Sequence, residues 1–461
     1  MTSAEGKKRI HFIGAGGCSM SGLALLMKNR GHIVTGSDRT KSHKTDMLNE
    51  IGAIIHIGHA VEQVRDADFI VYTAAISPDN PERVEAQRLG IPSLERADFI
   101  GRLMEGYENV ICVSGTHGKT TTTAMIAQMF VEAGAEPTVH IGGDLPALGG
   151  GTIQGGQEFF IAEACEFNGT FLKLKPTIPV ILNIDEDHLD CYKDLDDIEA
   201  AFARFAAITP AEGCAVGWGD DERVRRVLQD ARCRTRTYGL EPHNELRAVD
   251  IAYDAEGRAR FTVTLHGHQL AELELSVAGE HNMLNALAAL AVADLCELSI
   301  STAAQTLSHF TGAHRRFEQT SVTDGVRVFT DYGHNPAEIA NALHIASLQP
   351  HDRLWAVWQP HTYSRTKKLF GGFLTAFDVP DIVLVTDICG AREADPGDIH
   401  SSMVVEALRA RGIDARLTPS FDDAEEHLRA NWRAGDVVVT LGCGDIDLLN
   451  EQIAEHGDSE K

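Results

Sequence analysis

Residues 110–123, VICVSGTHGKTTTT, constrain the fold more than any other part of the 461-residue chain. Residues 111–113 form a short apolar run that predicts a buried strand, and residues 120–130 continue at helical spacing. Gly115 and Gly118 permit a tight turn between them, which leaves backbone N–H groups exposed at the start of the helix. A strand, a glycine turn and a helix in this order predict an α/β domain with an anion-binding loop.

Lys119 and Thr120 give this loop the chemistry of a nucleotide phosphate site. Lys119 can reach the outer phosphates, and the hydroxyl of Thr120 can bind Mg²⁺. The spacing G-x-x-G-K-T is shorter by two residues than the common phosphate loop, so a glycine turn without a ligand is the alternative. We favour nucleotide binding because both flanking elements are predicted. The loop residues that would contact the nucleotide are Gly115, Thr116, His117, Gly118, Lys119, Thr120 and Thr121.

Composition narrows the class of protein. The formal net charge of −26 repels polyanions, which argues against nucleic acid or an anionic membrane as the main partner, so anionic ligands must be held locally. The length indicates about three domains, and a hydrophobic content of 43% suffices for their cores. The nine cysteines form no C-x-x-C pair, and neither a signal peptide nor a long apolar span is recognisable. We therefore expect a cytoplasmic protein with free thiols.

A second glycine turn lies near the N-terminus. The pattern predicts a strand at Arg9–Ile13, a turn at residues 14–17, a helix over residues 20–27, and a further short strand that leads to Asp38. This order resembles a dinucleotide fingerprint, but Ser19 stands where its third glycine belongs. The pattern therefore indicates nucleotide or sugar-nucleotide binding in general. A turn that only allows close helix packing is the alternative.

Two further strands are predicted to end in acidic residues. Residues 159–162 lead to Glu163, and residues 178–184 lead to a stretch that contains His188. Carboxylates and an imidazole at strand ends, in the same domain as a phosphate loop, suit one or two Mg²⁺ ions that bridge nucleotide oxygens. Solvated loop positions are the alternative, and we prefer it for two other acids, Asp185 and Asp190.

Alternation over residues 250–277 predicts an antiparallel hairpin or three-stranded ribbon. An apolar helix is expected over residues 283–295. Asn282 precedes it and could be only its N-cap, whereas Asn285 lies on the same helical face, so that the two amides could read an adenine edge.

Beyond residues 311–313 strands and helices alternate, which predicts a doubly wound sheet. Its predicted strands are followed by polar clusters, which would share one sheet edge and define a working face. Two adjacent arginines, Arg315 and Arg316, precede the first of these strands, and a surface salt bridge is the alternative to a role in binding. A polar segment at residues 105–109 suggests the other boundary. We therefore expect domains at 1–107, 108–312 and 313–461.

Taken in order, these motifs resemble those of the Mur ligase family, the ATP-dependent amide-forming ligases of peptidoglycan precursor synthesis. The segments that carry the resemblance are GAGGCSMSGLA, SGTHGKTTT, NIDEDHLD, HRRFE, DYGHNPAEI and QPHTYSRT. The resemblance implies three α/β domains: a Rossmann-like domain for a UDP-sugar, a central P-loop ATPase-like domain with an added antiparallel ribbon, and a doubly wound Rossmann-like domain that presents an amino acid.

The resemblance also implies roles for individual residues. The UDP-sugar would be held by Gly14, Ala15, Gly16, Gly17, Ser19, Met20, Ser21, Gly22 and Asp38. Beyond the phosphate loop, ATP would be contacted by Asn282, Asn285, Arg316 and Asp331. Metal ions would be held by Thr120, Glu163 and His188. The catalytic set would be Lys119, His188, His334, His361 and Arg365, of which the last three would face the muramoyl carboxylate and the amino acid.

The implied reaction joins L-alanine to the carboxylate of UDP-N-acetylmuramate through an acyl phosphate, with ATP and Mg²⁺ as cofactors and a monomer or homodimer as the active form. Related ligases often have other residues at Cys165, Phe167, Asn168 and Asn335, and several carry a carboxylated lysine, whereas this chain has no lysine between Lys193 and Lys367. That absence fits the alanine-adding branch. The alternatives are a ligase that attaches a recycled peptide to the same sugar nucleotide and a nucleotide-binding regulator without activity.

Overall fold

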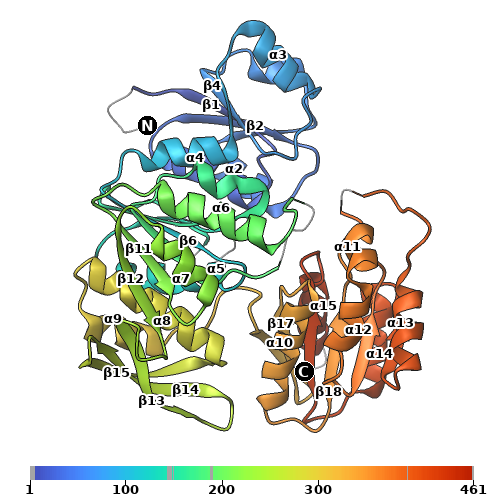
Figure 1. The fold of residues 1–461 in the computed structure, drawn as a ribbon. Coiled ribbons are helices and arrows are strands. Elements are labelled where there is room, and N and C mark those ends of the chain that lie inside the picture. Colours follow the sequence, from blue (N-terminus) through green and yellow to red (C-terminus); the bar gives the residue numbers. More distant parts are fainter. Residues whose placement is uncertain (1–5, 143–147, 149, 187–190, 392, 459–461) are drawn as a thin grey trace. The chain divides into compact units, whose positions relative to one another are not determined.

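The computed structural model describes residues 6–142, 148, 150–186, 191–391 and 393–458 (Figure 1). The chain divides into two compact units. The first comprises residues 1–252, 260–276 and 280–311, and the second comprises residues 253–259, 277–279 and 312–461. His188 and Asp190, to which the sequence assigned a metal ligand and a loop position, lie outside the described residues.

A parallel five-stranded sheet opens the first unit, with strand order β3-β2-β1-β4-β5. Its strands are β1 (Arg9–Ile13), β2 (Ile33–Asp38), β3 (Ile54–Ile57), β4 (Phe69–Tyr72) and β5 (Ser93–Glu95). Its helices are α1 (Cys18–Asn29), α2 (His43–Glu50), α3 (Pro81–Leu89), α4 (Arg96–Met104) and the 3₁₀ turn η1 (Val61–Val64). The predicted strand–turn–helix–strand order at the N-terminus is thus confirmed.

A ten-stranded sheet follows, in the order β15-β14-β13-β12-β11-β10-β6-β9-β7-β8. It belongs to the first unit except for the ends of β13, β14 and β15, which belong to the second. Its strands are β6 (Asn109–Ser114), β7 (Thr138–His140), β8 (Thr152–Ile153), β9 (Phe159–Glu163), β10 (Ile178–Ile181), β11 (Cys214–Trp218), β12 (Arg234–Gly239), β13 (Leu246–Tyr253), β14 (Arg258–Leu265) and β15 (His268–Ala278). Its helices are α5 (Lys119–Glu132), α6 (Leu195–Ala207), α7 (Glu222–Gln229), α8 (Glu280–Leu295), α9 (Ile300–Ser308) and the 3₁₀ segment η3 (Phe167–Lys173).

Three features of this sheet bear on the sequence predictions. The ribbon β13-β14-β15 is present, with short turns between its strands, as in hairpins. The strand predicted over residues 178–184 is too long, because β10 ends at Ile181 and the following residues leave the sheet to lie beside the phosphate loop. The helix predicted from residue 283 begins at Glu280.

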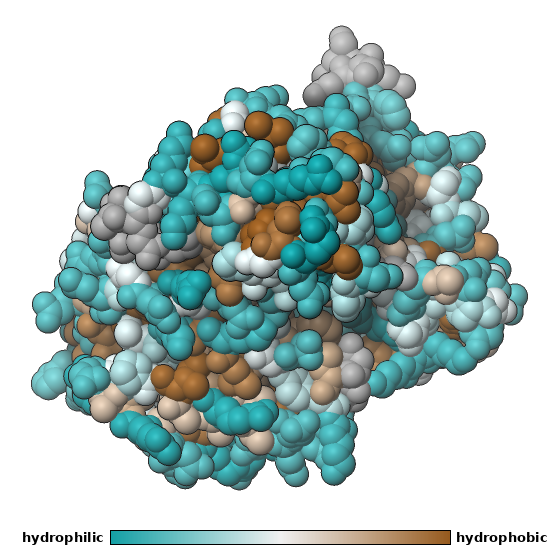
Figure 2. Space-filling model, turned by 90° about the horizontal axis from the view of Figure 1, so that it is seen from above, coloured by the Kyte–Doolittle hydropathy of each residue, from teal (hydrophilic) through white to brown (hydrophobic). Residues whose placement is uncertain are grey.

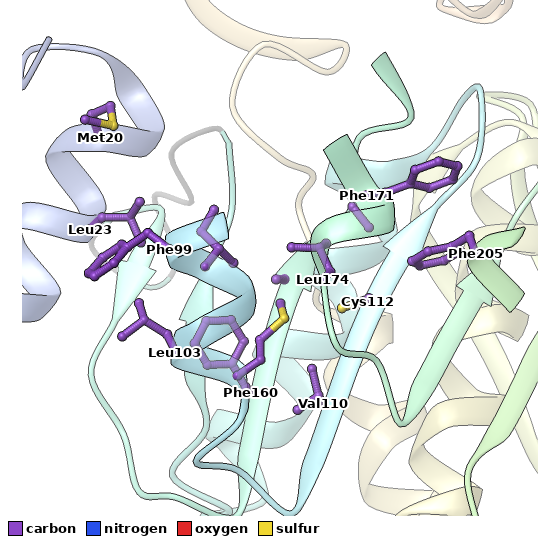
Figure 3. Close-up of a cluster of buried hydrophobic side chains, with 14 of the residues drawn as sticks. Met20, Leu23, Phe99, Leu103, Val110, Cys112, Phe160, Phe171, Leu174 and Phe205 are labelled. Carbon is purple, nitrogen blue, oxygen red and sulfur yellow. The ribbon is translucent and has the colours of Figure 1, made fainter. Parts of the chain in front are cut away.

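A large hydrophobic cluster is shared by both sheets of the first unit. Met20 and Leu23 of α1 and Phe99 and Leu103 of α4 belong to the same buried cluster as side chains of β6, β9 and η3 (Figure 3). Within it the rings of Phe171 and Phe205 stack with their centroids 4.7 Å apart. The two sheets are therefore held together by apolar burial, which is the main favourable contribution to folding.

The second unit contains a six-stranded sheet of order β16-β17-β21-β18-β19-β20, parallel except for its edge strand β16. The strands are β16 (Glu318–Thr323), β17 (Val326–Asp331), β18 (Leu354–Trp358), β19 (Ile382–Val385), β20 (Asp414–Leu417) and β21 (Val437–Leu441). The helices are α10 (Pro336–Leu348), α11 (Tyr363–Lys368), α12 (Phe370–Ala376), α13 (Ser401–Ala410), α14 (Phe421–Asn431) and α15 (Asp447–Asp458).

Both faces of this sheet are covered, as predicted for a doubly wound sheet. Trp358 of β18 packs with residues of α10, α12 and α13, whereas Trp355 of the same strand packs with residues of α14 and α15. The two tryptophans point to opposite faces because side chains alternate along a strand. The carboxyl ends of the parallel strands remain as the edge that carries the polar clusters.

No described helix is long and apolar enough to cross a membrane. On the face drawn in Figure 2, hydrophilic side chains predominate, and hydrophobic ones occur in separate groups.

Candidate active site

The phosphate loop connects β6 to α5 and depends on two glycines. Gly115 has φ +148° and Gly118 has φ +84°, in the region that side chains rarely adopt. A Cβ atom on Gly115 would lie 2.9 Å from Cβ of Leu182, and one on Gly118 would lie 2.6 Å from Oδ1 of Asn285. The loop therefore packs tightly against the segment after β10 and against α8. The N-terminus of the buried helix α5 directly follows the loop.

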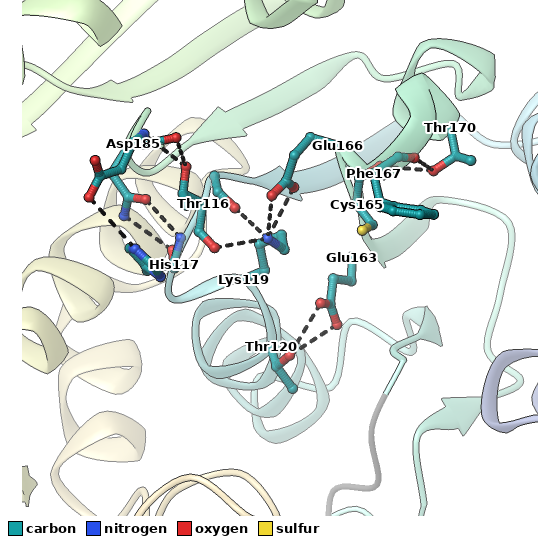
Figure 4. A network of polar contacts seen from close by, with 12 residues as sticks. Thr116, His117, Lys119, Thr120, Glu163, Cys165, Glu166, Phe167, Thr170 and Asp185 are labelled. Carbon is teal, nitrogen blue, oxygen red and sulfur yellow. Dashed lines mark hydrogen bonds and ion pairs between the residues drawn. The ribbon is translucent and has the colours of Figure 1, made fainter. Parts of the chain in front are cut away.

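Lys119 is folded back over this loop (Figure 4). Its Nζ donates to the carbonyl oxygen of Gly115 at 2.5 Å and of Thr116 at 3.1 Å, and it lies 3.0 Å from both carboxylate oxygens of Glu166. Burial lowers the pKa of Lys119, but nearby carboxylates, chiefly Glu166, outweigh burial and raise it overall. The ammonium is therefore charged at neutral pH, as a phosphate ligand must be. Glu166 was not among the predicted site residues.

Thr120 and Glu163 face one another, as the predicted metal site requires. The hydroxyl of Thr120 lies 3.2 Å from each oxygen of the Glu163 carboxylate (Figure 4). The backbone N–H of Gly142 lies 3.4 Å from one of these oxygens. A hydroxyl and a carboxylate are hard oxygen ligands that suit Mg²⁺, which usually takes one or two carboxylates together with water and substrate phosphates. The described residues contain no cluster of three acidic, histidine or cysteine side chains that could hold a metal by themselves.

The segment after β10 shapes the other side of the loop. Asn183 Oδ1 accepts from the backbone N–H of His117 at 2.8 Å, and its Nδ2 donates to the carbonyl oxygen of His117 at 3.1 Å. Asp185 donates its backbone N–H to the hydroxyl of Thr116 at 2.9 Å, while its carboxylate lies 3.8 Å from Nε2 of His117. Asp185 is an exposed loop residue, as predicted, but its backbone N–H group helps to hold the phosphate loop in place through Thr116. Asn183 was missed because the sequence placed it inside a strand predicted to continue to residue 184, whereas β10 ends at Ile181.

Helix α8 presents the two predicted amides. Nδ2 of Asn285 lies 3.3 Å from Oδ1 of Asn282, so the two side chains share a face as expected. The alternative that Asn282 is only an N-cap is wrong, because α8 begins at Glu280 and Asn282 lies in its first turn. Asn285 lies beside Gly118, which places this pair next to the phosphate loop.

The N-terminal glycine turn meets Asp38. The backbone N–H groups of Gly14 and Ala15 donate to the carbonyl oxygen of Ser37, and that of Gly16 donates to Oδ2 of Asp38 at 2.8 Å. A Cβ on Gly16 would lie 2.9 Å from the same Oδ2, so any side chain there would displace the Asp38 carboxylate. The structure thus brings together the glycine turn and Asp38, which the sequence predicted to act together. Gly17 is the last residue before α1.

The later residues of this motif contact neighbouring parts of the same unit. Ser19 lies between Nε2 of His140 at 2.8 Å and Nη1 of Arg96 at 3.0 Å. The side chains of Met20 and Ser21 are buried. A Cβ on Gly22 would lie 2.1 Å from Oγ1 of Thr152, so the absence of a side chain lets α1 approach β8. At Gly22 the structure therefore agrees with the alternative prediction, in which glycine only allows close packing of the helix.

A buried polar network in the same sheet was missed by sequence reasoning. Glu82 of α3 is fully buried and accepts from Ser37 at 2.5 Å, from His59 at 2.9 Å and from His11 at 3.3 Å. Asn80 caps this helix and Pro81 starts it, which fixes the place of Glu82. Burial raises the pKa of Glu82, but these hydrogen bonds outweigh burial and hold the pKa below its ordinary value.

In the second unit, Asp331 ends β17 and is held by backbone groups. Its two oxygens accept from the N–H of Gly333 at 2.7 Å and from that of Phe317 at 2.9 Å, while burial raises its pKa to about 6. Arg316 lies over the ring of Tyr332, 5.2 Å from its centroid. The guanidinium of its neighbour Arg315 is only partly exposed, donates to the carbonyl oxygens of Gly442 and Gly444, and forms an ion pair with Asp447 at 3.1 Å, which ties the sheet edge together.

The predicted amino-acid residues also gather at this edge. Nη1 of Arg365 lies 3.3 Å from Nδ1 of His361, and His334 is close enough to act electrostatically on His361. Burial, Arg365 and His334 together lower the pKa of His361 to about 4. Gln359 donates to Asp445 at 2.7 Å, which links the loops after β18 and β21. The polar clusters of this sheet thus form one edge, as predicted.

Comparison with known proteins connects these features to one family. Three family models match successive parts of the chain: "Mur ligase family, catalytic domain" over residues 9–108, "Mur ligase middle domain" over residues 113–293, and "Mur ligase, glutamate ligase domain" over residues 315–444.

Individual relatives agree with these matches. The UDP-N-acetylmuramate–L-alanine ligase of Acetivibrio thermocellus is 44% identical over 96% of this chain and 95% of its own length. That of Caldanaerobacter subterraneus is 44% identical over 97% of both chains. Among solved structures, the UDP-N-acetylmuramate-alanine ligase of Thermotoga maritima superposes with a TM-score of 0.84 at 27% identity and covers 98% of this chain and 100% of that one. With three domain models in order and such relatives over nearly its full length, the chain belongs to the Mur ligase family.

Proposed function

We propose that the protein is an ATP-dependent, ADP-forming ligase that joins L-alanine to the carboxylate of UDP-N-acetylmuramate, a step of peptidoglycan precursor synthesis. The observation that carries the proposal is the arrangement of Lys119, Thr120 and Glu163 around a phosphate loop, in a chain whose relatives at 44% identity are named for this reaction. ATP and Mg²⁺ would be its cofactors.

The chemistry requires activation of a carboxylate, because a carboxylate and an amine do not condense usefully in water. Transfer of the γ-phosphoryl group of ATP to the muramoyl carboxylate gives an acyl phosphate, whose phosphate is then displaced by the amine. Lys119 would neutralise charge on the transferring group, and Thr120, Glu163 and His188 would hold the metal. Bound Mg²⁺ would supply Lewis-acid stabilisation of the phosphoryl oxygens.

The substrate sites follow the same proposal. The glycine turn and Asp38 would bind the UDP-sugar, the phosphate loop with Asn282, Asn285, Arg316 and Asp331 would bind ATP, and His334, His361 and Arg365 would face the amino acid and the muramoyl carboxylate. A guanidinium can hold the free carboxylate of an amino acid through two parallel hydrogen bonds, which makes Arg365 the residue for that task.

Mass detection of the product tests the proposal. Purified protein is supplied with ATP, Mg²⁺ and UDP-N-acetylmuramate together with single amino acids or short peptides. The expected product is UDP-N-acetylmuramoyl-L-alanine, with one ADP for each amide. Product from a peptide but not from L-alanine would instead support the recycled-peptide ligase, and ATP binding without any product would support a regulator.

A further inference from the structure

The loop after β17 fixes the tautomer of His334. Its Nδ1 lies 3.2 Å from the carbonyl oxygen of Tyr332 and 3.3 Å from Oε2 of Glu338. A carbonyl and a carboxylate only accept hydrogen bonds, so Nδ1 must carry the hydrogen. The same Oε2 accepts from the backbone N–H of His334 at 3.1 Å, which holds the carboxylate in place. In the neutral ring the lone pair is therefore on Nε2.

His361 has the opposite tautomer to that of His334. Nη1 of Arg365 lies 3.3 Å from Nδ1 of His361, and a guanidinium has no acceptor atom, so Nδ1 accepts and Nε2 carries the hydrogen. His361 stays neutral at physiological pH, because burial, Arg365 and His334 disfavour its protonated form. Its Nε2 can donate a hydrogen bond but cannot take a proton. The two rings thus have different roles.

Other charged and titratable groups reach this cluster from several elements. They act on the two rings or on their partners from β17, from α10 and α11, from the loops after β19 and β21, and from the segment before β16. These groups are Asp331, Glu338, Arg365, Glu393, Cys443, Asp445 and Arg315. Of these, the Glu338 carboxylate is the one bonded to both the ring and the backbone of His334.

We propose that Glu338 is a positioning residue that holds His334 as the base for the incoming amine, while His361 is a hydrogen-bond donor at the same site. This inference rests on the proposed ligase function. Nε2 of His334 takes one proton from the alanine ammonium, and the neutral amine then attacks the carbonyl carbon of the acyl phosphate. As the carbon–nitrogen bond forms, the carbonyl electron pair moves to oxygen. Collapse of this intermediate breaks the carbon–oxygen bond to phosphate, which leaves with the second proton of the nitrogen.

The substitution Glu338→Gln tests this role. Glutamine keeps the size and an acceptor oxygen, but its amide can also donate to Nδ1 and so allows the tautomer whose Nε2 carries the hydrogen. We expect kcat for amide formation to fall by roughly 10- to 100-fold, as part of the benefit of base catalysis, with the KM for ATP within a few-fold. The acid limb of the kcat profile should also move to lower pH, because the carboxylate no longer stabilises the protonated ring.

Hydroxylamine separates this role from a structural one. It is largely uncharged at neutral pH, so it needs no base before it attacks the acyl phosphate, and it gives a hydroxamate. The Glu338→Gln and His334→Gln variants should therefore lose amide formation far more than hydroxamate formation. His361→Gln should retain a larger share of amide formation than His334→Gln, because glutamine keeps an N–H donor near the Nε2 position.

Glu406→Gln is the matched control, since Glu406 is an exposed residue of α13 and the substitution removes the same charge from the same unit. It should leave both products unchanged. Equal losses of amide and hydroxamate in Glu338→Gln, or an unchanged pH profile, would overturn the inference, as would a larger loss of amide in His361→Gln than in His334→Gln. Absence of any amide product from the unmodified protein would instead refute the proposed function itself.

Discussion

At the scale of single residues, Lys119 combines two tasks that the sequence does not separate. Its ammonium would act on phosphate, but in this structure it also compensates the buried carboxylate of Glu166, whose side chain is only 3% exposed. An uncompensated buried charge is strongly destabilising. A simple substitution of Lys119 therefore changes both catalysis and stability.

We expect Lys119→Met to lower kcat by at least about 100-fold, since a phosphoryl-stabilising charge is lost, and to lower the free energy of unfolding by about 3–5 kcal/mol, since the buried Glu166 carboxylate loses its ion pair with Lys119. The double variant Lys119→Met/Glu166→Gln should recover the melting temperature but not kcat. Differential scanning fluorimetry and steady-state kinetics on both variants check this. Recovery of turnover in the double variant would show that Lys119 acts only by neutralising Glu166.

Glu82 provides a second residue-scale prediction. Glu82→Ala removes the acceptor shared by His11, Ser37 and His59, so we expect a loss of about 3–5 kcal/mol in stability near neutral pH. The pKa of Glu82 is lowered in the folded protein, so its contribution to the free energy of unfolding is fully present at pH values above the ordinary pKa of a carboxyl group. This contribution disappears as the pH falls through the pKa of Glu82 in the folded protein. The melting temperatures of the variant and the unmodified protein should therefore converge towards acid pH. Glu62→Ala, at an exposed position, is the control.

At the scale of elements, periodicity and glycine turns predicted the strands and helices that position the site, including β1, β6, α5 and β18. These signals are local. Sequence reasoning failed where contacts between distant parts of the chain determine where an element ends or which side chains meet. Ile184 is apolar and looked like strand, but the chain leaves the sheet after Ile181 because Asn183 bonds to His117. Glu166 was missed because only folding brings it to Lys119, which is far away in the sequence. Glu338 was missed because its spacing of four residues from His334 does not show that the two side chains point toward each other.

Gly101 of α4 gives a prediction at this scale. A Cβ there would lie 2.1 Å from the carbonyl oxygen of Lys173 in η3, so Gly101→Ala must push the two elements apart. We expect a destabilisation of about 1–3 kcal/mol, seen as a lower melting temperature. Gly371→Ala is the matched control, because Gly371 lies in α12 with no atom within 4 Å of the added Cβ. There alanine should be neutral or stabilise by about 0.5–1 kcal/mol through helix propensity. Equal effects at both positions would refute the packing argument.

At the scale of the whole molecule, a protein of net charge −26 is proposed to bind two anionic nucleotides. The electrostatic field of the whole protein opposes the binding of both nucleotides, so affinity must come from local groups, such as Lys119 and the N-terminus of helix α5 for ATP. The domain ranges 1–107, 108–312 and 313–461, and a monomer or homodimer as the active form, stay predictions. Gel filtration with light scattering measures the latter.

The last prediction concerns coupling of the substrates. In the proposed reaction, residues that act on phosphate belong to the first unit, and residues that act on the amino acid belong to the second. An acyl phosphate hydrolyses if water reaches it, so a useful ligase must release phosphate only when the amine is present. We expect ATP alone to give almost no phosphate, ATP with UDP-N-acetylmuramate to give a small fraction of the full rate, and addition of L-alanine to restore it. A coupled phosphate assay with each substrate omitted in turn checks this. Equal phosphate release from ATP alone would mean that hydrolysis is the activity, and the ligase proposal would fail.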